Sequence, residues 1–204
     1  MSKYIKLSND HKELRSALYS QKPRQIKRLS DDVIHYHDWF VVEEVYPTEA
    51  KNMNLYQPVR DDWYVDGTRV KFVYRYDLKP VEMRRQYMVD KVNDYRAQYL
   101  NQAISLDGNL YDRDEKSMMR IAGATVMAIT DSTYQVEWVT ANNGSVILTA
   151  GEVVKLGKAQ AIFESRVINY ARRIKDEMLA SDSPESIDYL NGWPSPHFLS
   201  TDIQ

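Results

Sequence analysis

Between Val81 and Ala103 the chain contains no glycine or proline. Pro80 comes just before this stretch, where proline suits the first turn of a helix. Apolar and aromatic residues recur along it at spacings of seven, four, three, four and seven, namely Val81, Met88, Val92, Tyr95, Tyr99 and Leu106. This heptad-like stripe predicts a long amphipathic helix over 81–103. The helix either packs on its own domain or forms a short coiled coil with another copy.

Two more helices and a hairpin are expected after it. Asp112 and Glu115 stand in capping-box register and indicate a helix start. The inner side of that helix is predicted to carry Met118, Ile121, Ala122, Thr125, Val126 and Ile129. Strand-like runs at 134–140 and 145–148 flank an Asn-Asn-Gly turn and predict a hairpin. Thr149 and Glu152 form a second capping box, which opens a long helix reaching about residue 178.

The first 79 residues have a different pattern. Short helical segments are expected at 11–19 and 31–37. The run 39–46 is rich in β-branched and aromatic residues and predicts a strand. The dipeptide Asp66-Gly67 separates the strand-like runs 63–65 and 69–76, which predicts a hairpin.

The fold class is therefore predicted to be α+β, with a small N-terminal β-rich domain followed by a mainly helical domain with one β-hairpin. The expected boundaries are 1–79 for the first domain, 80–180 for the helical domain and 181–204 for a C-terminal docking tail. That tail contains Pro184 and the run Asn191-Gly192-Trp193-Pro194, so it cannot continue the helix. We expect it to dock against this chain or a neighbouring one.

Composition excludes several classes of protein. The 27 basic and 29 acidic residues leave a formal net charge of -2. The chain therefore lacks the excess of basic residues that is typical of nucleic-acid-binding proteins and of polybasic membrane anchors. No apolar run has the roughly 18 residues that a membrane span requires. The first residues lack a secretory signal, so we expect synthesis in a cytoplasm. With no cysteine there is no disulfide, zinc-thiolate site or cysteine nucleophile.

Candidate chemistry is sparse, and we predict no catalytic, cofactor or metal site. His35 and His37 would share a face only on an extended segment, and the sequence offers no third ligand nearby. The neighbouring acids Glu43-Glu44 and Asp61-Asp62 would point to opposite sides of a strand. Two carboxylates brought together in a cleft by folding remain the alternative that the sequence leaves open. A non-enzymatic protein is the preferred interpretation.

Aromatic composition indicates where surfaces become buried. The chain has 15 tyrosines against 4 phenylalanines, and amphipathic rings suit surfaces that are covered on assembly. The alternative is that these rings belong to a core within one chain, with their polar tips at its solvent-exposed edge. The residues predicted to form an interface between chains are Tyr87, Met88, Val92, Tyr95, Tyr99, Tyr170 and Trp193.

An ordered series of motifs resembles the phage domain of unknown function DUF4376. It begins with Arg-Ala-x-x-Leu at 96–100 and Gly-Asn-Leu-Tyr-Asp at 108–112, and continues with Ile-Ala-Gly-Ala at 121–124. It ends with Val-x-Trp-x-Thr at 136–140, Leu-Thr-Ala at 148–150, Leu-Gly at 156–157 and Asn-Gly-Trp-Pro at 191–194. The preceding half is similar to the leader that often precedes this domain in tail-fibre-associated proteins of tailed phages.

This resemblance implies a gene of the tail-fibre and host-recognition module, and it transfers no catalytic residues. We expect a structural component of a bacteriophage tail, namely a fibre-base or adaptor subunit of the baseplate region. A tail-fibre assembly chaperone is the alternative. The expected partners are other tail or fibre proteins and further copies of the chain, with a trimer favoured. The expected location is the virion tail, after synthesis in the host bacterial cytoplasm.

Overall fold

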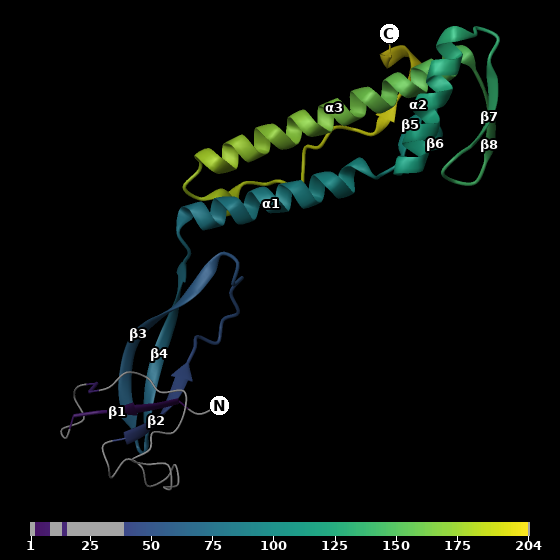
Figure 1. Cartoon of the computed structure of the whole chain (residues 1–204). Helices are drawn as coiled ribbons and strands as arrows, with labels where there is room; N and C mark the ends of the chain where they lie inside the picture. Colours follow the sequence, from purple (N-terminus) through teal and green to yellow (C-terminus); the bar gives the residue numbers. More distant parts are fainter. Residues whose placement is uncertain (1–2, 9–13, 16–38, 204) are drawn as a thin grey trace. The chain divides into compact units, whose positions relative to one another are not determined.

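The structure is a computed structural model and describes residues 3–8, 14–15 and 39–203 (Figure 1). The chain divides into two compact units, Met1–Pro80 and Val81–Gln204. The fold class is α+β, as predicted: a mixed four-stranded sheet precedes three helices that are interspersed with small sheets and a hairpin. The helices predicted at 11–19 and 31–37, together with His35 and His37, lie outside the described residues.

The first unit is built on a mixed sheet with the strand order β1-β2-β4-β3. Strand β1 (Lys3–Lys6) is antiparallel to β2 (Trp39–Val45), while β3 (Tyr56–Asp66) and β4 (Arg69–Leu78) form a long antiparallel hairpin. The predicted strand and the hairpin around Asp66-Gly67 are confirmed. Strand β2 runs parallel to β4, a pairing that local sequence patterns could not predict.

Alternating side chains of this sheet fill two small cores. One side buries Ile5, Phe40 and Phe72, together with Leu7, Val42 and Val70. The other side buries Tyr4, Trp39 and Val41. Strand β2 contributes to both cores because successive side chains point to opposite faces of a strand. Its continuous apolar run is therefore typical of a strand buried on both faces.

The second unit is organised around two long helices that lie side by side, α1 (Val81–Leu100) and α3 (Ala150–Ala180) (Figure 1). Helix α2 (Glu115–Thr130) packs against α3. The helix predicted over 81–103 is confirmed but ends at Leu100. Leu106 is therefore not part of the α1 stripe, because it lies in strand β5 (Ile104–Leu106).

The capping residues fix where helices start. The capping box of Thr149 and Glu152 is confirmed: the Glu152 carboxylate accepts hydrogen bonds from the Thr149 backbone and hydroxyl groups, both at 2.7 Å. The prediction that Asp112 caps α2 is wrong. Asp114 is the N-cap, and its carboxylate accepts from the backbone N–H groups of the second and third helical residues. Asp112 stands too far upstream to reach them.

The predicted inner side of α2 is also partly wrong. The buried residues are Ile121, Ala124 and Ala128, whereas Val126 is 62% exposed and Ile129 is 69% exposed. The packed face is therefore turned by about a quarter of a turn from the predicted one. Two contacts accompany this orientation of α2. Thr125 lies against Gly157 of α3, where a Cβ would come within 2.5 Å of its hydroxyl oxygen, and the Arg120 guanidinium lies 5.0 Å from the ring of Trp138.

Trp138 belongs to the predicted hairpin, which is confirmed as β7 (Gln135–Val139) and β8 (Ser145–Thr149). A second small sheet has the order β6-β5-β9, where β6 is Asn109–Tyr111 and β9 is His197–Phe198. Strand β9 brings the end of the chain back beside β5 in parallel. The described part of the chain contains no helix with the length and apolar character to cross a membrane.

Candidate functional site

The C-terminal tail is held by aromatic rings from both long helices. Trp193 lies with its ring centroid 5.3 Å from Tyr95, 5.1 Å from Tyr99 and 5.2 Å from Tyr170. Tyr189 of the tail adds an edge-on contact to Tyr95 at 6.2 Å. We name these five residues the aromatic cluster. Because Tyr95 and Tyr99 come from α1 and Tyr170 comes from α3, the tail joins the two helices at this point.

The polar tips of the cluster bind the backbone of the tail. The Tyr170 hydroxyl donates to the carbonyl of Asn191 at 2.7 Å, and the Tyr99 hydroxyl donates to that of Pro194 at 3.0 Å. The Trp193 indole N–H donates to the Tyr189 carbonyl at 2.8 Å. Phenylalanine could fill the same space but could not satisfy these carbonyls. The excess of tyrosine in this region is therefore explained by a docked irregular segment.

Two arginines of α1 fix the start of the tail. Arg84 is 7% exposed and places Nη1 2.5 Å from a carboxylate oxygen of Glu185. Its Nη2 donates to the Asp182 carbonyl at 3.1 Å, and Arg85 Nε donates to the Ser181 carbonyl at 2.9 Å. The tail is thus anchored by charge at its beginning, by the aromatic cluster in its middle and by β9 near its end.

The predicted interface residues all lie within the helical unit. Met88 and Val92 are buried, and Tyr87 is half-buried with Lys91 Nζ 5.5 Å from its ring centre. Tyr95, Tyr99, Tyr170 and Trp193 form most of the aromatic cluster. These contacts are made within one chain, which is the core alternative that the sequence left open. Use of the same residues by a second chain stays a prediction.

Two of the carboxylates considered for chemistry, Glu44 and Asp61, take part in structural contacts, and so does Asp107. Glu44 accepts a hydrogen bond from Lys3 Nζ at 2.5 Å, and this bond is the main reason that the pKa of Glu44 lies below its ordinary value. Asp61 forms an ion pair with Arg75. Asp107 binds both the hydroxyl and the backbone N–H of Ser200, and the hydroxyl contact is the main cause of its lowered pKa. Among the described residues, no three His, Asp or Glu side chains are grouped to hold a metal ion.

Arg113 is a buried charge that the sequence pattern did not reveal. It is 6% exposed, and its Nε donates to the Leu100 carbonyl at 2.9 Å. Its Nη1 donates to the Gln160 side chain and backbone oxygens at 2.5 and 3.1 Å, and its guanidinium lies 4.8 Å from the Phe163 ring. Burial lowers the pKa of Arg113. The residue joins the end of α1 to α3, and an arginine between two aspartates gives no signal of burial.

Open hollows occur at several places on the helical unit, among them these two. One lies beside the aromatic cluster, measures about 380 Å³ and is lined by Arg166, Asn169, Tyr170, Arg173 and Pro194. The other is an apolar groove of about 330 Å³ between α2 and α3, lined by Met118, Ile121, Ala122, Thr125, Gly157, Gln160, Ala161 and Glu164. Both lie at the surface, although Ile121 and Gln160 in the lining of the second are themselves buried.

Comparison with known proteins identifies the domain. Residues 83–191 match the family described as Domain of unknown function (DUF4376). Because the match covers more than half of the chain, the protein belongs to this family. The matched segment runs from the first turn of α1 to the tail residue that accepts the Tyr170 hydrogen bond. No curated protein and no solved structure matches the chain.

Proposed function

We propose that this protein is a non-enzymatic structural component of a tailed-phage tail, acting as a fibre-base or adaptor subunit that links the fibre to the tail. The particular assembly is suggested by the motif series at 96–194 and by the leader that precedes it. The observation that carries a structural role is the apolar surface of the helical unit. Met119, Val126 and Ile129 of α2 are each more than 60% exposed.

Apolar side chains gathered on one helix usually mark a surface that another protein covers. The hairpin adds two more, since Val139 is 57% exposed and Ile147 is 67% exposed. A subunit of a larger particle would bury these side chains on assembly. The partners that we propose are other tail or fibre proteins and further copies of the chain, with a trimer favoured, in the virion tail after synthesis in the host cytoplasm.

Three carboxylates of the chain are engaged in structural contacts. A general acid at neutral pH needs a pKa raised toward the working pH. The pKa values of Glu44, Asp107 and Glu152 are instead lowered, in each case mainly by a hydrogen bond to a neighbouring side chain. These groups stay charged and hold elements together, as an architectural role requires.

A tail-fibre assembly chaperone is the second candidate, and the same exposed apolar residues favour it. A chaperone must present apolar surface to a folding client. The two roles differ in when the protein acts. A chaperone acts while the fibre folds, whereas an adaptor is needed afterwards to attach a finished fibre.

An add-back experiment separates the two roles. Particles made without this protein are purified and mixed with finished fibres, with or without the purified chain. An adaptor restores fibre attachment and adsorption to host cells only when the chain is added. If finished fibres attach equally well without it, the adaptor role is refuted and the chaperone is supported. If fibres attach in neither mixture, although a wild-type extract restores attachment, the adaptor role is also refuted.

A further inference from the structure

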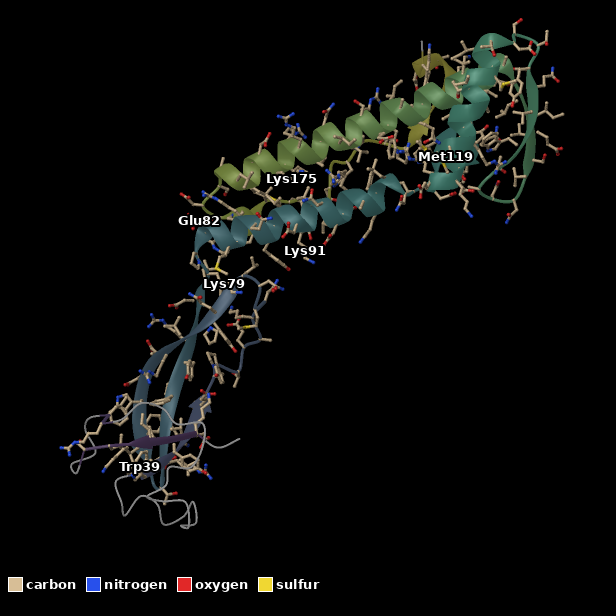
Figure 2. The ribbon with its side chains drawn as sticks, viewed as in Figure 1. Trp39, Lys79, Glu82, Lys91, Met119 and Lys175 are labelled. Carbon is tan, nitrogen blue, oxygen red and sulfur yellow. The ribbon has the colours of Figure 1, made fainter. Side chains whose placement is uncertain are left out.

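The side of α2 that points away from the core is apolar and uncharged. It carries Met119, Ala122, Gly123, Val126, Met127 and Thr130, which we name the α2 outer face (Figure 2 labels Met119). Met119 is 62% exposed, Val126 62% and Met127 52%. Ile129 borders this face, and no charged residue occurs from Ile121 to Thr130. A helix that is apolar on both sides is normally covered on both sides.

We propose that a second copy of this chain covers the α2 outer face, with the two α2 helices antiparallel about a two-fold axis. The axis passes near Ala124 and Thr125, midway between the ends of the face. This surface is distinct from the residues predicted to form an interface on α1. The inference does not depend on the proposed function, since it concerns the purified chain alone, and it assigns Met119 and Val126 to a two-fold pair and not to the trimer favoured there.

Side-chain size supports pairing of the face with itself. In an antiparallel pair centred at this point, Gly123 of one copy lies opposite Val126 of the other. Met119 lies opposite Thr130. Each pair thus joins a larger side chain to a smaller one, which is how packed helices interdigitate. A Cβ placed on Gly123 would meet nothing within 4 Å in the single chain, so this position is open to a partner.

Charge complementarity supports the antiparallel direction. The face is bordered at its start by Lys116 and at its end by Asp131, both of which are exposed. Both residues lie on the same side of the stripe, because helical positions advance by about 100° per residue. In a two-fold antiparallel pair, Lys116 of each copy approaches Asp131 of the other. In a parallel pair, Lys116 of one copy and Asp131 of the other would lie about 22 Å apart along the axis, so these opposite charges would not meet.

Cysteine cross-linking tests the direction and register, and the chain contains no cysteine of its own to interfere. With a rise of 1.5 Å per residue, Val126 lies about 4.5 Å along the axis from its symmetry mate, whereas Met119 lies about 16 Å from its own. Val126→Cys should therefore form a disulfide-linked dimer on mild oxidation, and Met119→Cys should not. A mixture of Met119→Cys and Thr130→Cys chains should cross-link. A cross-link of Met119→Cys to itself would overturn the antiparallel arrangement.

Light scattering of the purified chain tests whether the pair forms at all. We expect a dimer whose dissociation constant rises by more than about 100-fold in Val126→Glu, because the charge would be buried without a partner. Ile168→Glu is the matched control, since Ile168 is an exposed isoleucine on α3, and it should leave the dimer intact. Both substituted residues are exposed in the single chain, so both variants should fold. A wild-type chain that stays monomeric at about 100 μM overturns the proposal.

Exchanging the charges at Lys116 and Asp131 distinguishes a two-fold pair from any other protein that could cover the α2 outer face. Lys116→Glu alone and Asp131→Lys alone should each weaken self-association roughly 3- to 30-fold, because each creates two like-charge contacts. A mixture of the two variants should form heterodimers about as tight as the wild type, since both contacts then join opposite charges. Equal behaviour of the mixture and of the separate variants would contradict the two-fold pair.

Discussion

Gly192 lies directly against the hydroxyl group of Tyr170. Its φ is +80°, a conformation that residues with a Cβ rarely adopt, and a Cβ at this position would overlap the Tyr170 hydroxyl. The same hydroxyl donates to the carbonyl of Asn191 at 2.7 Å. The close approach therefore lets Trp193 follow the turn and reach the rings of Tyr95 and Tyr99. Docking of the tail depends on this glycine.

Gly192→Ala should destabilise the helical unit by about 1–3 kcal/mol, because backbone strain and a steric overlap are added together. Urea unfolding followed by tryptophan fluorescence measures the change. Gly151→Ala is the matched control, since Gly151 is an exposed helical position where a Cβ meets nothing within 4 Å. It should be neutral or stabilising. Equal destabilisation by both variants would contradict the role assigned to Gly192.

Tyr170→Phe should cost about 1 kcal/mol through loss of its hydrogen bond to Asn191. In combination with Gly192→Ala, however, it removes the group that the added Cβ would overlap. The double variant should thus be more stable than the sum of the two single effects predicts, by about 0.5–2 kcal/mol. A double-mutant cycle of unfolding free energies measures this coupling. Strict additivity would show that the two residues do not act on each other.

Glu185→Ala should cost about 1–3 kcal/mol, because it leaves Arg84 charged in a site where its side chain is 9% exposed. The ion pair of Arg75 with Asp77 is the comparison, since its side chains are 55% and 38% exposed. Asp77→Ala should change the unfolding free energy by less than about 1 kcal/mol. Chemical unfolding of both variants gives the two values. A larger loss for Asp77→Ala would contradict the anchoring role of Arg84.

The free energy of unfolding should fall at acid pH, because a carboxylate that caps a helix of the helical unit becomes protonated. The pKa of Glu152 is lowered in the fold, mainly by its hydrogen bond with the Thr149 side chain. A lowered pKa means that the contribution is complete above the ordinary carboxyl pKa of about 4 and is lost as the pH falls through the lower folded value. Glu152→Gln should therefore show a shallower loss of stability between about pH 5 and pH 2 than the wild type.

Unfolding free energies measured across this range test the acid prediction. Glu177→Gln, an exposed substitution near the other end of α3, is the matched control and should follow the wild-type curve. If Glu152→Gln has the same pH dependence as the wild type, the capping box is not part of the acid response.

Local patterns in the sequence predicted the elements that depend on neighbouring residues. The absence of glycine and proline after Pro80 predicted α1, and the capping box of Thr149 and Glu152 located the start of α3. The turn at Asp66-Gly67 predicted the β3–β4 hairpin. In each case the physical cause lies within a few residues, so a single chain segment contains the whole signal.

Features that depend on distant contacts were not predictable in the same way. The parallel pairing of β2 with β4 and the return of β9 beside β5 join segments far apart in the sequence. In its observed orientation α2 contacts Gly157 and Trp138, which lie on other elements. For the same reason, the sequence indicated the aromatic residues of the candidate site and a tail that docks on this chain or a neighbouring one, but not that the tail would pack on those residues.

Mass spectrometry of gradient-purified phage particles tests the structural role most directly, with the copy number measured against the tail tube protein. We predict that the chain is present at a fixed, stoichiometric copy number in every preparation. Absence from particles that still need the chain to acquire fibres would contradict the structural role and would support the assembly chaperone instead.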